Sequence, residues 1–577
     1  MSNPVPVLSL YDISIRSIMD FYNCFKNDPD FKILPENMLF DVYYMFYREK
    51  RLCLLGVEFG DLDVFARMLK VSNKRLQLLK SFQTLMDHGT QVAKELSNSY
   101  RIRTALEMPT LPQKISVIDL GISLGGFLNE AGWFHESEQV LSACLCLCNT
   151  LPDQPSMWRK SLECCHKLLH AQAVYCMIEP AEQTRQMAAE LAEKLFAAGE
   201  TMNLAGLYSE FSLYSFTKSN YDEAFKWSMQ AIQELNEHCS PRVTIEALSQ
   251  ASKACIVKRE FVKAGELVRQ AVHLARDIYG PQHPKFADTL LDYGFYLLNN
   301  DCIKQSVAIY EEALALKKAL YGRYNLHVAV AQEDLAYALY VHEYSSGNFR
   351  IARENAEKAI RLMKQLLPEE HLMLASAQRV HALILEEIAL DNIPGTSYAT
   401  STELLKTAEK LHKNALRLTR LSFGEDNVQT AKHYGNLGRL YQSMRQFKEA
   451  EQMHLKAIAI KEKLVGPEDY EVGLSVGHLA SLYNYHMHEY RKAEQLYFRS
   501  IKINLQLYSA TYSGLEYDYR GLIHVYDKLG HRDKVSEYMV LLTKWKELRE
   551  CLALRETSPL VLEEGPKTLA YIKQLVA

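Results

Sequence analysis

The chain has 577 residues, of which 48% are hydrophobic and 24% are charged, a composition typical of a soluble folded protein. Its 66 basic and 70 acidic residues leave a net charge of −4, which gives no electrostatic reason to expect nucleic acid as a partner. No apolar run reaches the roughly 18 residues that a membrane span needs. The 12 cysteines are scattered and the first residues lack a secretory pattern, so we expect reduced thiols and a cytoplasmic location.

The first predicted helix carries an apolar stripe. Leu10, Ser14 and Ile18 are spaced at i, i+4 and i+8, so a helix that follows Ser9 brings them onto one face. This spacing resembles an elongin-binding box, whose leucine enters an apolar groove on elongin C, although Ser14 stands where that box usually has cysteine. An amphipathic helix that only caps a repeat array would show the same stripe, so both interpretations stay open.

A proline-containing segment follows with its own spacing. Leu34, Pro35, Met38 and Val42 form an apolar-Pro-x-x-apolar-x-x-x-apolar pattern that resembles a cullin-2 box. Substrate receptors of cullin-2 ubiquitin ligases carry the two boxes in this order. We therefore predict that residues 1–50 dock onto elongin C, with elongin B, and onto cullin-2 with its RING subunit. Residues 51–114 are expected to form a helical linker or capping region.

A helix-pair pattern recurs over residues 115–548. In the segment 434–458 it matches the tetratricopeptide repeat, a helix–turn–helix unit of about 34 residues. The matching positions are Leu437, Gly438, Tyr441, Ala450, His454 and Ala457. We expect about nine or ten such units, with degenerate ones over 158–198 and 374–420. Because one unit cannot bury its own apolar face, the sequence predicts an all-α, tetratricopeptide-repeat solenoid of stacked units.

Three features depart from the regular repeat. The unit that runs from Leu479 to Ala493 and beyond has one extra residue in its turn. Residues 391–402, DNIPGTSYATST, predict a long turn inside one unit. The tail, 549–577, is expected to be poorly ordered apart from a short helix at its end.

Two matches to catalytic or metal-binding patterns have simpler explanations. Residues 121–125, GISLG, match the nucleophile elbow, but they lie inside a repeat helix and not on a strand–turn–helix corner. Cys144 and Cys148 share a helix face while Cys146 points away, which favours a structural role for them over metal binding. We therefore expect a non-catalytic adaptor that needs no metal or other cofactor.

The first helix of each repeat lines the concave groove of such a solenoid, so its groove-facing polar residues are candidates to bind a peptide. The lysine and arginines among them could hold an acidic group such as a C-terminal carboxylate, and the acidic residues could pair with a peptide arginine. Alternatively, these charges are solvated or pair with one another. The same repeat offsets place Leu474, Gly477 and Tyr517 in the groove. The predicted peptide-binding residues are Asp288, Asp292, Glu333, Asp334, Lys432, Arg439, Gln442, Asn484 and Arg520.

Several long strings resemble the amyloid protein-binding protein 2 family, among them LPENMLFDVYYMFY, QASKACIVKREF, TAKHYGNLGRLYQSMRQFKEAE and SGLEYDYRGLI. The resemblance runs from about residue 10 to residue 548. It implies a substrate receptor held on a cullin-2–RING ligase by elongins B and C, which recognises C-terminal degrons with Arg and Gly separated by two residues. It also implies self-association, nuclear or membrane-associated pools, and association with microtubules and the tail of the amyloid precursor protein.

Two functions follow as hypotheses. The first is a ubiquitin-ligase substrate receptor, for which residues 1–50 serve assembly and the groove serves capture. The second is a microtubule-associated cargo adaptor for the amyloid precursor protein, similar to kinesin light chain, whose association with motors or tubulin would not need residues 1–50.

Overall fold

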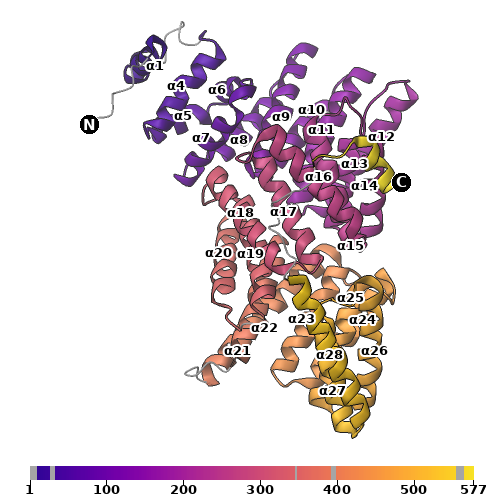
Figure 1. Cartoon of the computed structure of the whole chain (residues 1–577). Coiled ribbons are helices and arrows are strands. Elements are labelled where there is room, and N and C mark those ends of the chain that lie inside the picture. Colours follow the sequence, from indigo (N-terminus) through magenta and orange to yellow (C-terminus); the bar gives the residue numbers. More distant parts are fainter. Residues whose placement is uncertain (1–8, 26–32, 345–346, 392–397, 554–564) are drawn as a thin grey trace. The chain divides into compact units, whose positions relative to one another are not determined.

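The computed structural model describes residues 9–25, 33–344, 347–391, 398–553 and 565–577, and its regular elements are helices (Figure 1). They form two compact units. The first comprises residues 1–214, 282–284 and 315–328, and the second comprises residues 215–281, 285–314 and 329–577. Within the described ranges, none of the helices combines the length and apolar character that crossing a lipid bilayer requires.

The first unit contains the N-terminal helices and the first repeat pairs. Its helices are α1 (Leu10–Asp20), α2 (Tyr22–Phe25), α4 (Glu36–Arg48), α5 (Leu52–Gly60), α6 (Leu62–Leu69), α7 (Arg75–Asp87), α8 (Val92–Ala105), α9 (Leu111–Ala131), α10 (Phe134–Cys148), α11 (Pro155–Val174), α12 (Ile178–Ala197) and most of α13 (Ala205–Thr217).

The second unit contains the later repeat pairs, and it shares α18 (Ile303–Tyr321) and α19 (Leu326–Glu343) with the first. Its other helices are α14 (Tyr221–Glu234), α15 (Pro241–Val257), α16 (Phe261–Tyr279), α17 (Pro284–Asn299), α20 (Arg350–Leu366), α21 (Met373–Leu390), α22 (Tyr398–Phe423), α23 (Val428–Ser443), α24 (Phe447–Val465), α25 (Tyr470–Leu482), α26 (Tyr490–Leu507), α27 (Leu515–Leu529), α28 (Arg532–Ala553) and α29 (Leu569–Val576).

Aromatic rings form the core that joins the predicted linker region to the first repeat helix. Phe59, Phe65, Phe82 and Phe127 come from α5, α6, α7 and α9, and each is at most 1% exposed. The Phe65 and Phe82 ring centroids lie 5.2 and 5.1 Å from that of Phe127. Such edge-on pairs contribute about 0.5–1.5 kcal/mol each beyond the burial of their surface. Residues 51–114 therefore fold as packed helices continuous with the repeats.

Small residues in the first helix of a pair make room for large residues in the second, as the repeat pattern predicts. A Cβ atom on Gly438 of α23 would lie 2.9 Å from the ring of His454 on α24, and one on Gly294 of α17 would lie 2.9 Å from the ring of Tyr310 on α18. The Ser306 hydroxyl then donates to the Gly294 carbonyl at 2.8 Å and closes the pair. This packing confirms the tetratricopeptide-type register.

A loop distant in sequence completes the first unit. Asn325 is fully buried, and its side-chain amide donates to the Ala131 carbonyl at 2.7 Å and to the Gln83 side chain at 2.9 Å. The Asp87 carboxylate accepts the backbone N–H groups of Arg323 and Tyr324. These bonds attach residues 322–325 to α7 and to the end of α9.

The irregular segments differ in part from expectation. The extra residue after Leu479 is absorbed as a π-helical turn, Tyr483–Met487, between α25 and α26. The predicted long turn 391–402 is wrong at its end, because α22 already begins at Tyr398; residues 392–397 lie outside the described part. The short terminal helix is α29, which packs against α14 and α16 through Ile572 and Val576.

Candidate docking helix and peptide groove

Helix α1 presents an apolar ridge on its outer face. Its start is fixed by a capping box, in which the Ser9 hydroxyl accepts the Asp12 N–H at 3.1 Å. The inner face buries Ile15 and Met19 against α4. On the outer face Leu10 is 81% exposed and Ile13 is 51% exposed.

The rest of the predicted elongin-binding stripe lies beside this ridge. Ser14 is exposed and donates its hydroxyl hydrogen to the Leu10 carbonyl at 2.9 Å, while Ile18 is half-buried. The Tyr11 hydroxyl donates to the Asp41 carboxylate at 2.6 Å, which ties α1 to α4. Helix α1 is therefore held in place against α4, while the side chain of Leu10 remains exposed to solvent.

The predicted cullin-binding residues are divided between surface and core. Pro35 is exposed at the start of α4, and Leu34 and Met38 are half-buried. The Leu34 carbonyl accepts a hydrogen bond from the Arg67 guanidinium. Val42 is 0% exposed within the core around α4, so the expectation that its side chain meets a partner is wrong for this structure.

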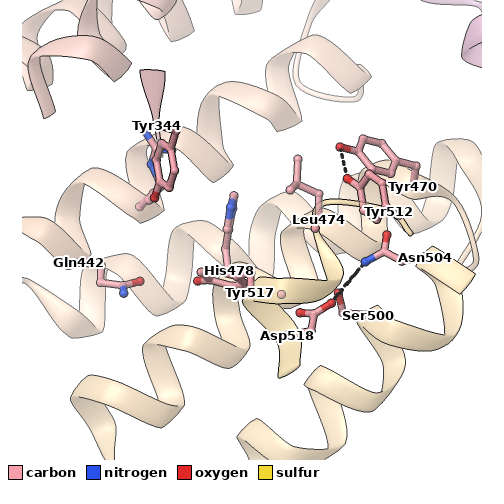
Figure 2. A pocket seen from close by; sticks show the side chains of 13 residues that line it. Tyr344, Gln442, Tyr470, Leu474, His478, Ser500, Asn504, Tyr512, Tyr517 and Asp518 are labelled. Atoms are coloured by element: carbon pink, nitrogen blue, oxygen red, sulfur yellow. Dashed lines mark hydrogen bonds between the residues drawn. The ribbon is translucent and has the colours of Figure 1, made fainter. Parts of the chain in front are cut away.

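The second unit contains a cavity of about 240 Å³ along the helices expected to line the groove. Figure 2 shows side chains around it that come from α23, α25, α26 and α27, together with Tyr344 just after α19. Residues that the repeat register assigned to the groove and that line this cavity are Arg439, Gln442, Leu474, Gly477 and Tyr517.

Aromatic side chains and glycines form one wall of the cavity. The Tyr512 hydroxyl donates to the Tyr470 hydroxyl at 3.1 Å (Figure 2). The Arg259 guanidinium lies 4.2 Å from the centre of the Tyr470 ring. A Cβ atom on Gly477 would come within 3.3 Å of the Ser500 hydroxyl. Gly514 lies at the same cavity, so backbone is accessible there to a bound chain.

Asp518 is a buried carboxyl group in this cavity that is absent from the predicted peptide-binding residues. It accepts hydrogen bonds from the Ser500 hydroxyl at 2.8 Å and from the Asn504 side-chain amide at 3.3 Å (Figure 2). Burial raises the pKa of Asp518 to about 7, and these two hydrogen bonds oppose the rise. The register pointed instead to its neighbours Tyr517 and Arg520, so no sequence signal marked Asp518.

The predicted cationic residues are paired within the fold. The Arg439 guanidinium binds Glu386 at 2.8 Å and donates to the Tyr340 hydroxyl at 3.0 Å. Lys432 pairs with Glu471 at 2.9 Å, and the buried Lys461 binds the same carboxylate at 3.0 Å. Both lysines hold the pKa of Glu471 well below its usual range against its burial, and the neighbouring residue Tyr470 lines the cavity.

The predicted acidic residues Asp292, Glu333 and Asp334 come together as a cluster on α17 and α19. Lys253 pairs with Asp292 at 3.4 Å. The pKa of Asp334 is raised to about 8 by burial first and then by the charges of Glu333 and Asp292, and Lys253 opposes the rise. Burial also raises the pKa of Glu333. Arg379 opposes the rise at Glu333, so the cluster brings three carboxyl groups together beside two cations, Lys253 and Arg379.

Three other predicted residues have different environments. Arg520 is exposed and pairs with Glu516 one turn away at 2.7 Å. Asp288 lies at the surface near Lys285, at 3.9 Å. Asn484 is 0% exposed in the π-helical turn, where its amide donates to the Gly521 carbonyl at 3.1 Å, so it has no exposed atom with which to contact a peptide.

One family model agrees with the repeat architecture. A tetratricopeptide-repeat family model matches residues 397–463. A Rap protein complexed with competence and sporulation factor aligns at 13% identity with 68% of this chain and 98% of its own, with a TM-score of 0.49. The nearly identical TPR-like repeats of a kinesin light chain-like protein from Podosopora anserina align at 16% identity with 39% of this chain and 98% of theirs, with a TM-score of 0.30.

Whole-chain relatives carry the family assignment. The chain is 51% identical over 543 residues to amyloid protein-binding protein 2 of Mus musculus, which covers 94% of this chain and 92% of that protein. The identity and coverage are the same for the protein of that name from Rattus norvegicus. The stacked repeat pairs and the extent of this identity show that the chain belongs to the amyloid protein-binding protein 2 family.

Proposed function

We propose that this protein is the substrate-recognition subunit of a cullin-2–RING ubiquitin ligase, with α1 as the elongin-docking helix and the second unit's groove as the receptor for C-terminal degrons. The observation that carries the proposal is the ridge on α1. Leu10 is 81% exposed on a helix whose opposite face is packed, which is the arrangement that helix-in-groove recognition needs.

The binding free energy expected from burial of Leu10 is large enough to determine whether the complex with elongin C forms. Full burial of a leucine side chain in a partner's groove contributes about 1.5–3 kcal/mol, or roughly tenfold to 100-fold in affinity. A charged residue at that position would have to be desolvated as well. Because Leu10 makes little contact within its own fold, the substitution should leave the fold intact.

The first experiment is therefore a pull-down with Leu10→Asp. Elongin C, elongin B and cullin-2 should be lost, and the melting temperature should not change. Leu106→Asp is the matched control, because Leu106 is also a surface leucine of the first unit, at 63% exposure, but lies outside α1. Equal retention of elongin C by L10D and L106D would contradict the docking role.

We propose that the groove recognises a C-terminal Arg-x-x-Gly sequence through charge pairing and through close approach of the peptide backbone at a glycine. The cluster of Asp292, Glu333 and Asp334 would pair with the peptide guanidinium, whose charge would favour the ionised form of Asp334. Lys432 and Lys461, which share the Glu471 carboxylate, would attract the terminal carboxylate. Gly477 at the cavity wall would let the peptide backbone lie close.

A binding titration with labelled peptides tests this second step. The D292N/E333Q/D334N variant should weaken an Arg-x-x-Gly peptide by about 100-fold or more, the equivalent of about 3 kcal/mol for one lost buried charge pair. It should bind a peptide with citrulline in place of arginine no worse than the unchanged protein does. Asp277→Asn, a half-exposed carboxylate on α16, is the control. Unchanged affinity in the triple variant would remove this assignment.

The name of the mouse and rat relatives favours a second candidate function for the same groove. Those proteins are described as amyloid protein-binding, so the tail of the amyloid precursor protein is a proposed cargo. In a microtubule-associated adaptor, tubulin or motor association would survive deletion of residues 1–50. Loss of that association together with elongin binding would argue against an independent transport role. Self-association, which either function could use, is tested by light scattering on the same samples.

A further inference from the structure

A group of buried cysteine sulfurs lies in the first unit. Cys144 and Cys148 occupy successive turns of α10, and Cys164 reaches them from α11. Their three sulfur atoms all lie within 4.8 Å of one another. The residues are 0%, 3% and 0% exposed, and all three thiols are free. The sequence pattern gave only the α10 pair, because Cys164 joins it through the packing of two helices.

We propose that these three cysteines form a binding site for a soft metal ion in a three-coordinate thiolate environment, with Cu(I) as the ion that fits best. When three sulfurs bind an ion in one plane with metal–sulfur bonds of about 2.3 Å, the sulfurs lie about 4 Å apart. The observed spacing needs only a small contraction to reach that geometry. Thiolate is the ligand that Cu(I) prefers among protein groups.

The number of ligands separates Cu(I) from zinc. Structural zinc sites are almost always four-coordinate. Among the described residues, the group that approaches this geometry consists of these three cysteines alone. Their burial also leaves little room for a water as a fourth ligand, so a three-coordinate ion suits the site better.

The surroundings account for both the empty and the loaded state. Cys144 donates weakly to the Ile118 carbonyl at 3.5 Å and Cys164 to the Leu141 carbonyl at 3.4 Å, so both of these sulfurs carry a proton when no ion is bound. Binding replaces S–H bonds by S–Cu bonds and releases the protons to solvent, without any change of oxidation state.

The test is a Cu(I) competition against a chromophoric chelator, under reducing and anaerobic conditions, with the full chain. A background variant, C24S/C53S/C146S/C551S, first removes the exposed cysteines that would bind Cu(I) on any surface. It should retain one Cu(I) per chain. Adding C148S or C164S should abolish retention, whereas adding C255S, a buried cysteine on α15, should not.

X-ray absorption on the loaded background variant checks the geometry without a core substitution and should give three sulfur neighbours. The proposal is overturned if the background variant retains no Cu(I), or if C148S and C164S retain as much as C255S. Retention of Zn(II) in preference to Cu(I) would overturn it as well. So would a disulfide that persists among the three cysteines under the reducing conditions of the assay.

Discussion

Arg439 is a groove residue whose replacement by alanine should destabilise the second unit by about 3–5 kcal/mol. Its guanidinium donates two hydrogen bonds to one oxygen of Glu386, at 2.8 and 3.2 Å, and Glu386 is 1% exposed. Ser443 holds the other oxygen at 2.8 Å. Removal of the guanidinium leaves this carboxylate buried with a single hydroxyl donor. Because Arg439 itself is 23% exposed, water can enter, and the lower end of the range is expected.

Urea unfolding followed by circular dichroism measures this loss. Arg417→Ala is the matched control, because Arg417 binds Glu370 at the same 2.7–2.8 Å but on the surface, with exposures of 46% and 72%. Surface pairs contribute about 0–1 kcal/mol. Adding Glu386→Gln to R439A should recover part of the stability, since a neutral amide is less costly to bury than a carboxylate. If R439A costs no more than R417A, the pair is not a buried ionic contact and the reasoning fails.

Two further predictions concern the same unit. Gly438→Ala should lower the free energy of unfolding in urea by about 1–3 kcal/mol, because its Cβ would lie 2.9 Å from the His454 ring. Gly435→Ala is the control and should be neutral or slightly stabilising, because the nearest contact of its Cβ would be Ala457 at 3.9 Å. Equal losses in the two variants would contradict the packing argument. Burial lowers the pKa of His433 and of His454 to about 3, so their neutral forms stabilise the fold fully above the ordinary value of 6.5 and stability is lost as the pH falls below it. The melting temperature should drop between about pH 7.5 and pH 5, and His454→Phe should make that drop smaller.

The helix pairs were predictable because small and large residues alternate at fixed offsets. Gly438 and His454 occupy positions that one pair alone defines, so their contact follows from local sequence. The contact of Asn325 with Gln83 and Ala131 could not be predicted in this way. It joins residues about 200 positions apart, and neither segment carries a sequence pattern that predicts contact with the other. The π-helical turn was visible as one extra residue, but its conformation depends on burial of the Asn484 side chain.

The sequence predicted several of the residues that line the cavity, but not how their charged side chains are paired. Repeat offsets placed Arg439, Gln442 and Tyr517 at the groove, and all three line the cavity. The offsets could not show that Arg439 is satisfied by Glu386, because α21 lies outside that unit's own pattern. Val42 failed for a related reason. A helix buried on a broad face takes in residues that a one-stripe pattern assigns to a partner.

These pairings leave one sharp consequence for peptide binding. Because Arg439 and Lys432 are already paired, the charge that a ligand can change most is that of Asp334, whose pKa is raised to about 8. At neutral pH this carboxyl group is largely protonated, and a peptide arginine would favour its charged form. Binding should therefore release a proton, so affinity should rise as the pH is raised from about 6 to 8.

Polarisation titrations of an Arg-x-x-Gly peptide over that pH range measure the effect, with Asp334→Asn as the variant. The substitution should flatten the pH dependence, because an amide cannot lose the proton. Asp518, whose pKa is raised to about 7, titrates in the same pH range, so Asp518→Asn is the control that separates the two carboxyl groups. If D518N flattens the profile and D334N does not, the arginine lies in the cavity beside Ser500 and Asn504, and the acidic cluster on α17 and α19 is not its receptor.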